Sequence, residues 1–217
     1  MSASTVHGGS SKNNLLWKVL IFFSLYAVLR YLVFKGVALI HFPLYIVNKI
    51  LSISGIFFLA LSYVTGKSIW PIFEDAPSRN QFVKYCGLAG FSLIAMHVFI
   101  SLIILTPAYF PKFYQDDMMN LTGEVSMLMG VVSLYFFSIP AITTIPFMQE
   151  AVGIQKWQKG QRMGYFGLVT SLLHVGAMGL DGWIKWQLWP GYMPPISLLA
   201  AILVCIPLYY KLAGKAS

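Results

Sequence analysis

The chain has 217 residues, of which 58% are hydrophobic and only 10% are charged. An ordinary soluble domain carries about 25% charged residues, so this composition excludes a soluble globular protein and indicates that lipid is the main solvent and contact partner. The formal net charge of +8 is expected to report membrane orientation and contact with anionic headgroups, and it gives no support for nucleic-acid binding.

Six apolar windows are long enough to form transmembrane helices, because a spanning helix needs about 20 mostly apolar residues. They cover residues 15–36, 43–65, 83–106, 121–146, 163–181 and 193–211. Pro140 and Pro207 interrupt the fourth and sixth windows, where we expect kinks rather than helix ends, because membrane helices tolerate proline. The prediction is an all-α, polytopic six-helix bundle over residues 15–211, with a disordered tail at 1–14 and a second tail at 212–217.

Positive charges near the helix ends predict the orientation of this bundle. With the amino terminus inside, ten lysines and arginines lie on the cytoplasmic side and five on the outer side. Because cytoplasmic loops carry the excess of positive charge, we expect a multi-pass protein of the cell inner membrane with both termini in the cytoplasm. The outer five are Arg30, Lys35, Lys49, Lys112 and Lys185.

Two of the four histidines lie deep inside predicted helices. His97 is in the third window, 13 residues beyond Lys84, and His174 is in the fifth, 12 residues beyond Arg162. The two windows run in the same direction, so at about 1.5 Å per residue the imidazoles differ in depth by only ~2 Å. An ionisable group inside the membrane is a functional hypothesis by default. Histidines at matched depth can clamp a haem iron from both sides, whereas the alternative is that each is a neutral imidazole hydrogen-bonded to Ser, Thr or a backbone carbonyl.

Small residues accompany both histidines along their helices. They leave room either for close helix packing, which is the commoner arrangement, or for a flat cofactor. The six positions are Gly87, Gly90, Gly164, Gly167, Gly176 and Gly179.

The stretch WQKGQRMGYFGLVTSLLH, which runs from Trp157 to His174, resembles the fifth-helix pattern of the ferric-reductase-like transmembrane family. This family includes NADPH oxidases, six-helix metalloreductases and the haem-binding membrane subunit of the periplasmic methionine-sulfoxide reductase system, which the chain resembles most in length. Trp157, Arg162, Tyr165 and His174 match the pattern by position, while Gln161 stands where the family often has its inner histidine. Glutamine does not ligate haem iron, so the resemblance implies a single-haem variant.

The resemblance implies a membrane b-type cytochrome subunit, with one haem b ligated by His97 and His174, rather than a complete enzyme. Members of the family receive electrons from a cytoplasmic flavin, nucleotide or quinol and pass them outward to a metal ion, oxygen or a partner protein. The chain lacks a Gly-rich nucleotide fingerprint. The donor is therefore expected to be a flavoprotein subunit, a quinol, or an FMN or quinone held by the cytoplasmic loops.

Arg30 lies in the outer part of the first window, where it can pair with a haem propionate or extend to the outer headgroups, and the sequence slightly favours the headgroups. Lys156, Lys159, Gln161 and Arg162 form a predicted basic cytoplasmic loop. This loop can bind a flavin phosphate or an electron-donating subunit, or it can be a topology signal that contacts lipid.

Two other functions compete with electron transfer. A redox-inactive structural subunit of a larger membrane complex would keep the bundle without the cofactor, and Gln161 supports this alternative. A small-solute transporter is disfavoured, because the six windows show no internal repeat and contain few intramembrane polar groups.

Overall fold

A computed structural model describes residues 7–66 and 75–214. Six helical segments in these ranges are long and apolar enough to cross a membrane. This finding confirms the all-α membrane bundle that composition and hydropathy predict. The six segments are Asn14–Phe34, Leu39–Thr65, Ala76–Ile104, Leu121–Thr143, Ile154–Ile184 and Pro190–Ala213.

The first two membrane segments combine several helix types. The first combines the part of α1 (His7–Ala27) from Asn14 onward with a π-helical turn (Val28–Phe34). The second opens with a 3-10 turn (Leu39–His41) and a π-helical turn (Phe42–Ile46), which continue into α2 (Val47–Thr65).

The remaining elements follow in chain order, with α5 as a short helix between two membrane segments. They are α3 (Ala76–Ile104), a 3-10 turn (Pro111–Phe113), β1 (Tyr114–Gln115), β2 (Met118–Met119), α4 (Leu121–Thr143), α5 (Pro146–Val152), α6 (Ile154–Ile184), two 3-10 turns (Trp186–Leu188 and Pro190–Tyr192) and α7 (Ile196–Ala213).

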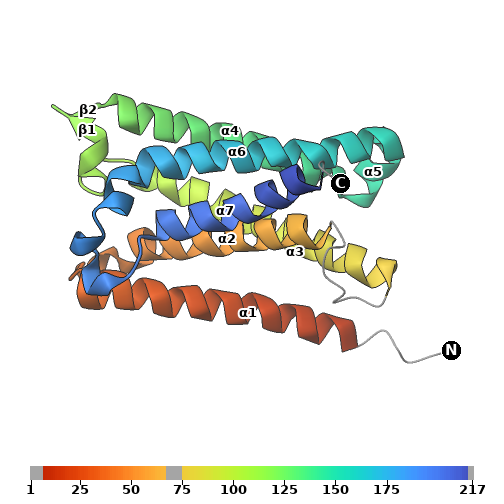
Figure 1. Cartoon of the computed structure of the whole chain (residues 1–217), viewed down its shortest axis with the longest axis horizontal. Coiled ribbons are helices and arrows are strands. Elements are labelled where there is room, and N and C mark those ends of the chain that lie inside the picture. Colours follow the sequence, from red (N-terminus) through yellow and green to blue (C-terminus); the bar gives the residue numbers. More distant parts are fainter. Residues whose placement is uncertain (1–6, 67–74, 215–217) are drawn as a thin grey trace.

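The helices form two closely packed pairs, α2 with α3 and α4 with α6, and α7 lies between α2 and α6. Helix α1 packs on the outside of α2 (Figure 1). The segment that contains α2 is 61% buried, whereas no other membrane segment exceeds 28%, so α2 is the central helix of the bundle. The start of α1 and the end of α7 lie toward one end of the bundle, here called the terminal end, and the β1–β2 hairpin marks the opposite, hairpin end (Figure 1).

Side-chain caps set the starts of two long helices. The backbone N–H of Ser78 donates to the Asp75 carboxylate at 2.6 Å before α3, and the N–H of Gly123 donates to the Asn120 side chain at 3.0 Å before α4. Such caps satisfy backbone donors that a helix start leaves without a partner. Pro140 and Pro207 lie inside α4 and α7, and both helices continue past them, as the sequence predicts.

Several boundaries differ from the sequence-based expectation. Helix α6 begins at Ile154, nine residues before the fifth window at 163, so the predicted basic loop is the first part of a helix. Hydropathy detects only the lipid-embedded part of a helix, whereas Lys, Gln and Arg also favour helix outside the lipid. Helix α1 begins at His7, within the expected tail, while residues 1–6 and 215–217 lie outside the described residues.

The sequence predicts no strand, but Tyr114–Gln115 pairs with Met118–Met119 in a short antiparallel hairpin. Asp116 and Asp117 form its turn with φ values of 49° and 60°. A two-residue hairpin turn with positive φ at both central positions matches the twist of the strands, and Asp tolerates this conformation better than most residues.

Candidate functional site

The neighbouring helix α2 holds the imidazole of His97, which lies on α3. The Nδ1 atom of His97 lies 2.7 Å from the side-chain Oδ1 of Asn48 and 3.2 Å from the Asn48 main-chain oxygen. Asn48 is only 4% exposed, and its Nδ2 donates to the Ser101 hydroxyl at 2.9 Å. Because Nδ2 is used by Ser101, the amide is oriented with Oδ1 toward the imidazole.

Helix α4 holds His174, which lies on α6, in a similar way. The Nδ1 atom of His174 lies 2.6 Å from the main-chain oxygen of Ser126 and 3.3 Å from the Ser126 hydroxyl. Gly130 faces the same ring, and a Cβ atom at Gly130 would lie 3.0 Å from Nδ1 of His174. The missing side chain at Gly130 therefore lets the imidazole lie close against α4.

These contacts assign the same tautomer to both imidazoles. A carbonyl or amide oxygen can only accept a hydrogen bond, so the Nδ1 atom that faces it carries the hydrogen in each ring. The Nε2 atom of a neutral imidazole then keeps its lone pair. Within the described ranges, the hydrogen bonds of His97 and His174 all involve Nδ1. Metal-ligating histidines commonly have this arrangement, with the second ring nitrogen donating to a carbonyl or carboxylate.

The two histidines lie on α3 and α6, which do not pack extensively against each other. Helix α3 packs on α2 and α4, whereas α6 packs on α4 and α7. Both imidazoles are partly buried, and they are near enough to interact electrostatically. His97 lies seven residues before the end of α3, and His174 lies ten residues before the end of α6, so both are in the half of the bundle toward the hairpin end.

The donor set suits a haem iron better than a bare metal ion. Among the described residues, no group of three or more His, Cys, Asp or Glu side chains could hold a metal ion. Two neutral imidazoles would supply two nitrogen ligands to a haem iron, which needs no further protein ligand. His97 and His174 therefore fit the requirements of a bis-histidine haem.

Arg30 lies in the hairpin-end half and points into the protein. It is 6% exposed, donates to the main-chain oxygen of Met193, and lies 5.4 Å from the centre of the Tyr31 ring. Its Nε is buried and has no hydrogen-bond partner among the described residues. This burial differs from the headgroup contact that the sequence slightly favours. The reason is that the segment before α7 covers Arg30 and offers it a carbonyl.

Two lysines complete a positively charged region near the histidines. Lys49 lies 4.3 Å and 5.0 Å from the ring centres of Tyr45 and Tyr31, and it acts electrostatically on His97. Lys112 donates to the main-chain oxygen of Met178 and acts electrostatically on His174. Arg30 interacts electrostatically with Lys49, so Arg30, Lys49 and Lys112 form a basic cluster in which Lys49 lies near His97 and Lys112 lies near His174.

The pKa of Lys112, which follows α3 in the hairpin-end loop, is lowered to about 8. Although much of its side chain is exposed, desolvation is the largest cause, and the positive charges of Lys49 and Lys35 add to it, while Asp181 opposes them. A charged ammonium is therefore less favourable here than in water.

Gln161 and Arg162 lie toward the terminal end, away from the histidines. The Nε2 atom of Gln161 donates to the main-chain oxygen of Pro140 at 3.1 Å and to the hydroxyls of Thr143 and Thr144 at 3.3 Å and 3.2 Å. Gln161 thus joins α6 to the end of α4. Arg162 is exposed. Gln161 precedes His174 by 13 residues, or about 20 Å along a helix, so these side chains do not form one site with the histidines.

Most of the glycines serve helix packing. A Cβ atom at Gly90 would lie 2.8 Å from the backbone nitrogen of Leu59, and one at Gly167 would lie 2.7 Å from the Phe137 ring. A Cβ atom at Gly164 or at Gly179 would come closer still, to the side chains of Tyr63 and Ser197 respectively. Gly176 differs, because a Cβ atom there would have no atom within 4 Å.

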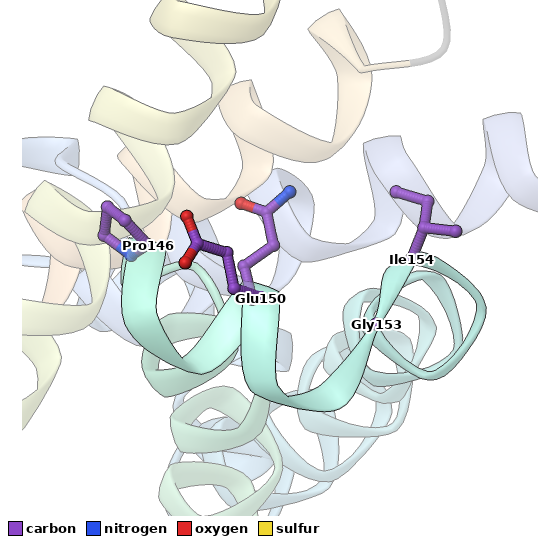
Figure 2. Close-up of a pocket in the computed structure, with 5 residues that line it drawn as sticks. Pro146, Glu150, Gly153 and Ile154 are labelled. Carbon is purple, nitrogen blue, oxygen red and sulfur yellow. The ribbon is translucent and has the colours of Figure 1, made fainter.

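A hollow at the terminal end is separate from the histidines. It is lined by Pro146, Gln149, Glu150, Gly153 and Ile154. Figure 2 shows the Glu150 carboxylate beside Pro146 at this hollow. Its position on α5 and the start of α6 places it at the opposite end of the bundle from His97 and His174 (Figure 1).

The polar partners of the histidines are the residues that sequence reasoning missed. Asn48 and Ser126 are polar residues inside apolar windows, and the sequence does not distinguish them from polar neighbours such as Lys49 and Glu124. Their pairing with His97 and His174 depends on which helices are neighbours, and the linear sequence does not contain that information.

No protein-family profile matches the chain. The chain is similar to metalloreductase STEAP2 of Homo sapiens, with 26% identity over 197 residues, and to the same protein of Mus musculus, with 25% identity over 197 residues. In both cases the match covers 78% of this chain and 40% of the relative. The chain thus spans less than half the length of these relatives. This distant similarity supports a metalloreductase-like membrane domain. The more specific resemblance to the methionine-sulfoxide reductase subunit stays a prediction.

Proposed function

We propose that the chain is a membrane b-type cytochrome subunit, in which His97 and His174 ligate one haem and electrons pass to a partner protein or another acceptor. The haem would supply one-electron chemistry, alternating between ferric and ferrous iron. The chain would supply the imidazoles of His97 and His174 as ligands, their hydrogen-bond partners, and the helices that separate the cofactor from lipid and water.

The tautomer of the two imidazoles is the observation that carries the proposal. Each Nδ1 is used by an oxygen acceptor of a neighbouring helix, so each Nε2 lone pair is available for iron. The alternative from the sequence, a hydrogen-bonded structural imidazole, accounts for Nδ1 but leaves both Nε2 atoms without a role. Distant similarity to metalloreductases is consistent with redox chemistry.

The basic cluster supports the orientation of the haem. Propionates are anionic, and Arg30, Lys49 and Lys112 lie in the hairpin-end half of the bundle near the histidines. A buried cation is costly unless an anion or several acceptors stabilise it. We therefore assign the propionates to this cluster, with Arg30 as one partner.

The electron donor and the membrane orientation are parts of the same proposal. Lys156, Lys159 and Arg162 lie on the first part of α6, toward the terminal end, where α1 starts and α7 ends (Figure 1). Under the positive-inside rule this end faces the cytoplasm of a cell with the protein in its inner membrane. A flavoprotein, an FMN or a quinol would deliver electrons there, and the acceptor would be reached from the hairpin end.

The direct test is the haem content of the purified protein. Wild-type protein should contain about one haem per chain with a low-spin bis-histidine spectrum, and His97→Ala and His174→Ala should each lose it. His41→Ala is a matched control, because His41 contacts the Tyr109 ring, 5.4 Å between centres, and is not part of the site. Added imidazole should restore a low-spin spectrum to an alanine variant that is still folded. Wild-type protein without haem, or unchanged haem in both alanine variants, would refute the proposal.

A redox-inactive structural subunit is the second candidate function. Gln161 favours this function, because it occupies the position where the family often has its inner histidine and its hydrogen bonds join α6 to α4. A colourless purified protein that is stable without haem would support this function over electron transfer.

A further inference from the structure

The two histidines differ in the kind of oxygen that accepts their Nδ1 hydrogen bond. His174 donates to the main-chain oxygen of Ser126, whereas His97 has its shortest contact, 2.7 Å, with the side-chain oxygen of Asn48. A substitution at Asn48 can therefore alter the hydrogen bond of His97 without moving the backbone of either helix.

Asn48 is built into this position by further contacts. It is 4% exposed, and its Nδ2 donates to the Ser101 hydroxyl at 2.9 Å, one helical turn beyond His97. The same hydroxyl lies 3.5 Å from Nδ1 of His97. The amide is thus held between an imidazole and a hydroxyl of α3, with its orientation determined by both.

A hydrogen bond from Nδ1 makes the imidazole a better electron donor through Nε2. A stronger acceptor at Nδ1 therefore stabilises ferric iron relative to ferrous iron, and a weaker acceptor does the opposite. We propose that Asn48 is a positioning residue that sets the reduction potential of the haem by accepting this hydrogen bond from His97, an inference that rests on the proposed function.

The size of the effect follows from what remains when the amide is removed. In an Asn48→Ala variant, the main-chain oxygen of Asn48, 3.2 Å from Nδ1, can still accept, so the bond is weakened rather than lost. We expect a roughly threefold to tenfold increase in the ratio of reduced to oxidised haem at a fixed potential, where tenfold corresponds to about 59 mV for a one-electron couple. Asn48→Asp introduces a charged acceptor, which forms a stronger hydrogen bond, and should shift the ratio in the opposite direction.

The experiment is a spectroscopic redox titration of the purified full-length protein in detergent, with haem content measured in parallel. Ser101→Ala removes the group that orients the amide, and it should shift the ratio in the same direction as Asn48→Ala but by less. Ser62→Ala is a matched control. Ser62 is also a buried residue of α2 that bonds to α3, donating to the main-chain oxygen of Val83 at 3.0 Å. It lies 14 residues after Asn48, or about 21 Å along the helix, and its loss should leave the potential unchanged.

The outcomes separate this proposal from the function on which it rests. Wild-type protein without haem overturns both. If the wild-type protein contains haem, and the Asn48 and Ser101 variants have the same reduction potential as the wild type, only the role of Asn48 is overturned. If Asn48→Ala does not retain haem, the shifts in reduction potential of Ser101→Ala and Asn48→Asp test the proposal instead. Shifts of opposite sign in the alanine and aspartate variants, with none in Ser62→Ala, support the proposal, because a merely structural loss would not reverse sign.

Discussion

A single added methyl group at Gly130 should weaken haem binding by displacing His174. The Cβ atom of an alanine at this position would lie 3.0 Å from Nδ1 and 3.2 Å from Cε1 of the imidazole, whereas ordinary contacts begin near 3.4 Å. The ring must therefore move by roughly 0.4 Å away from α4. That movement lengthens the 2.6 Å hydrogen bond to Ser126 and turns Nε2 away from its position. Changes to such supporting contacts typically cost about 10-fold to 100-fold in metal affinity, and we expect about 10-fold for Gly130→Ala.

The assay is titration of haem into the haem-free protein, followed by absorbance. Gly176→Ala is the control, because Gly176 is two residues from His174 but a Cβ atom there meets nothing within 4 Å. The haem affinity of Gly176→Ala should equal that of the wild type. Equal affinity for Gly130→Ala and the wild type would refute the reasoning, and so would an equal loss in both variants, since that would reflect a general sensitivity of these helices to alanine.

Two further predictions concern stability. Gln161→Ala should lower the free energy of unfolding in detergent by about 1 kcal/mol, because it removes a donor to the Pro140 carbonyl and to two threonine hydroxyls. Haem content should stay at the wild-type level. Loss of haem with unchanged stability would contradict the structural role of Gln161. The pKa of Lys112 is lowered to about 8 in the folded protein, whereas the usual pKa of a lysine is about 10.4. Between these two pH values the unfolded chain binds more protons than the folded chain, so the free energy of unfolding should rise shallowly with pH over this window. Lys112→Met should flatten that rise in a pH series of thermal unfolding, and an equally steep rise in the variant would assign it to other groups.

The membrane segments could be predicted because they depend on local composition. Each contains a run of apolar residues that only lipid can solvate, and proline inside a run, as at Pro140, does not change that requirement. The start of α6 could not be located in this way. Its first turns contain Lys156 and Lys159, which form helix readily but are invisible to a hydropathy window.

The candidate site was predicted in part. His97 and His174 could be selected because an imidazole inside an apolar helix is costly without a function or a partner. Their hydrogen-bond partners could not be selected, because Asn48 is about 50 residues from His97 in sequence and meets it only through the packing of α2 on α3. The direction of Arg30 depends similarly on the segment before α7, which supplies the carbonyl of Met193.

The division of the bundle into an α2–α3 pair and an α4–α6 pair also has a consequence for biosynthesis. Chains enter the membrane from the amino end, so Asn48 and His97 can meet as soon as the third membrane segment is in place. His174 follows only with the fifth. A cofactor that needs both histidines can therefore bind only late in synthesis. It would then link the early α2–α3 pair to the later α4–α6 pair.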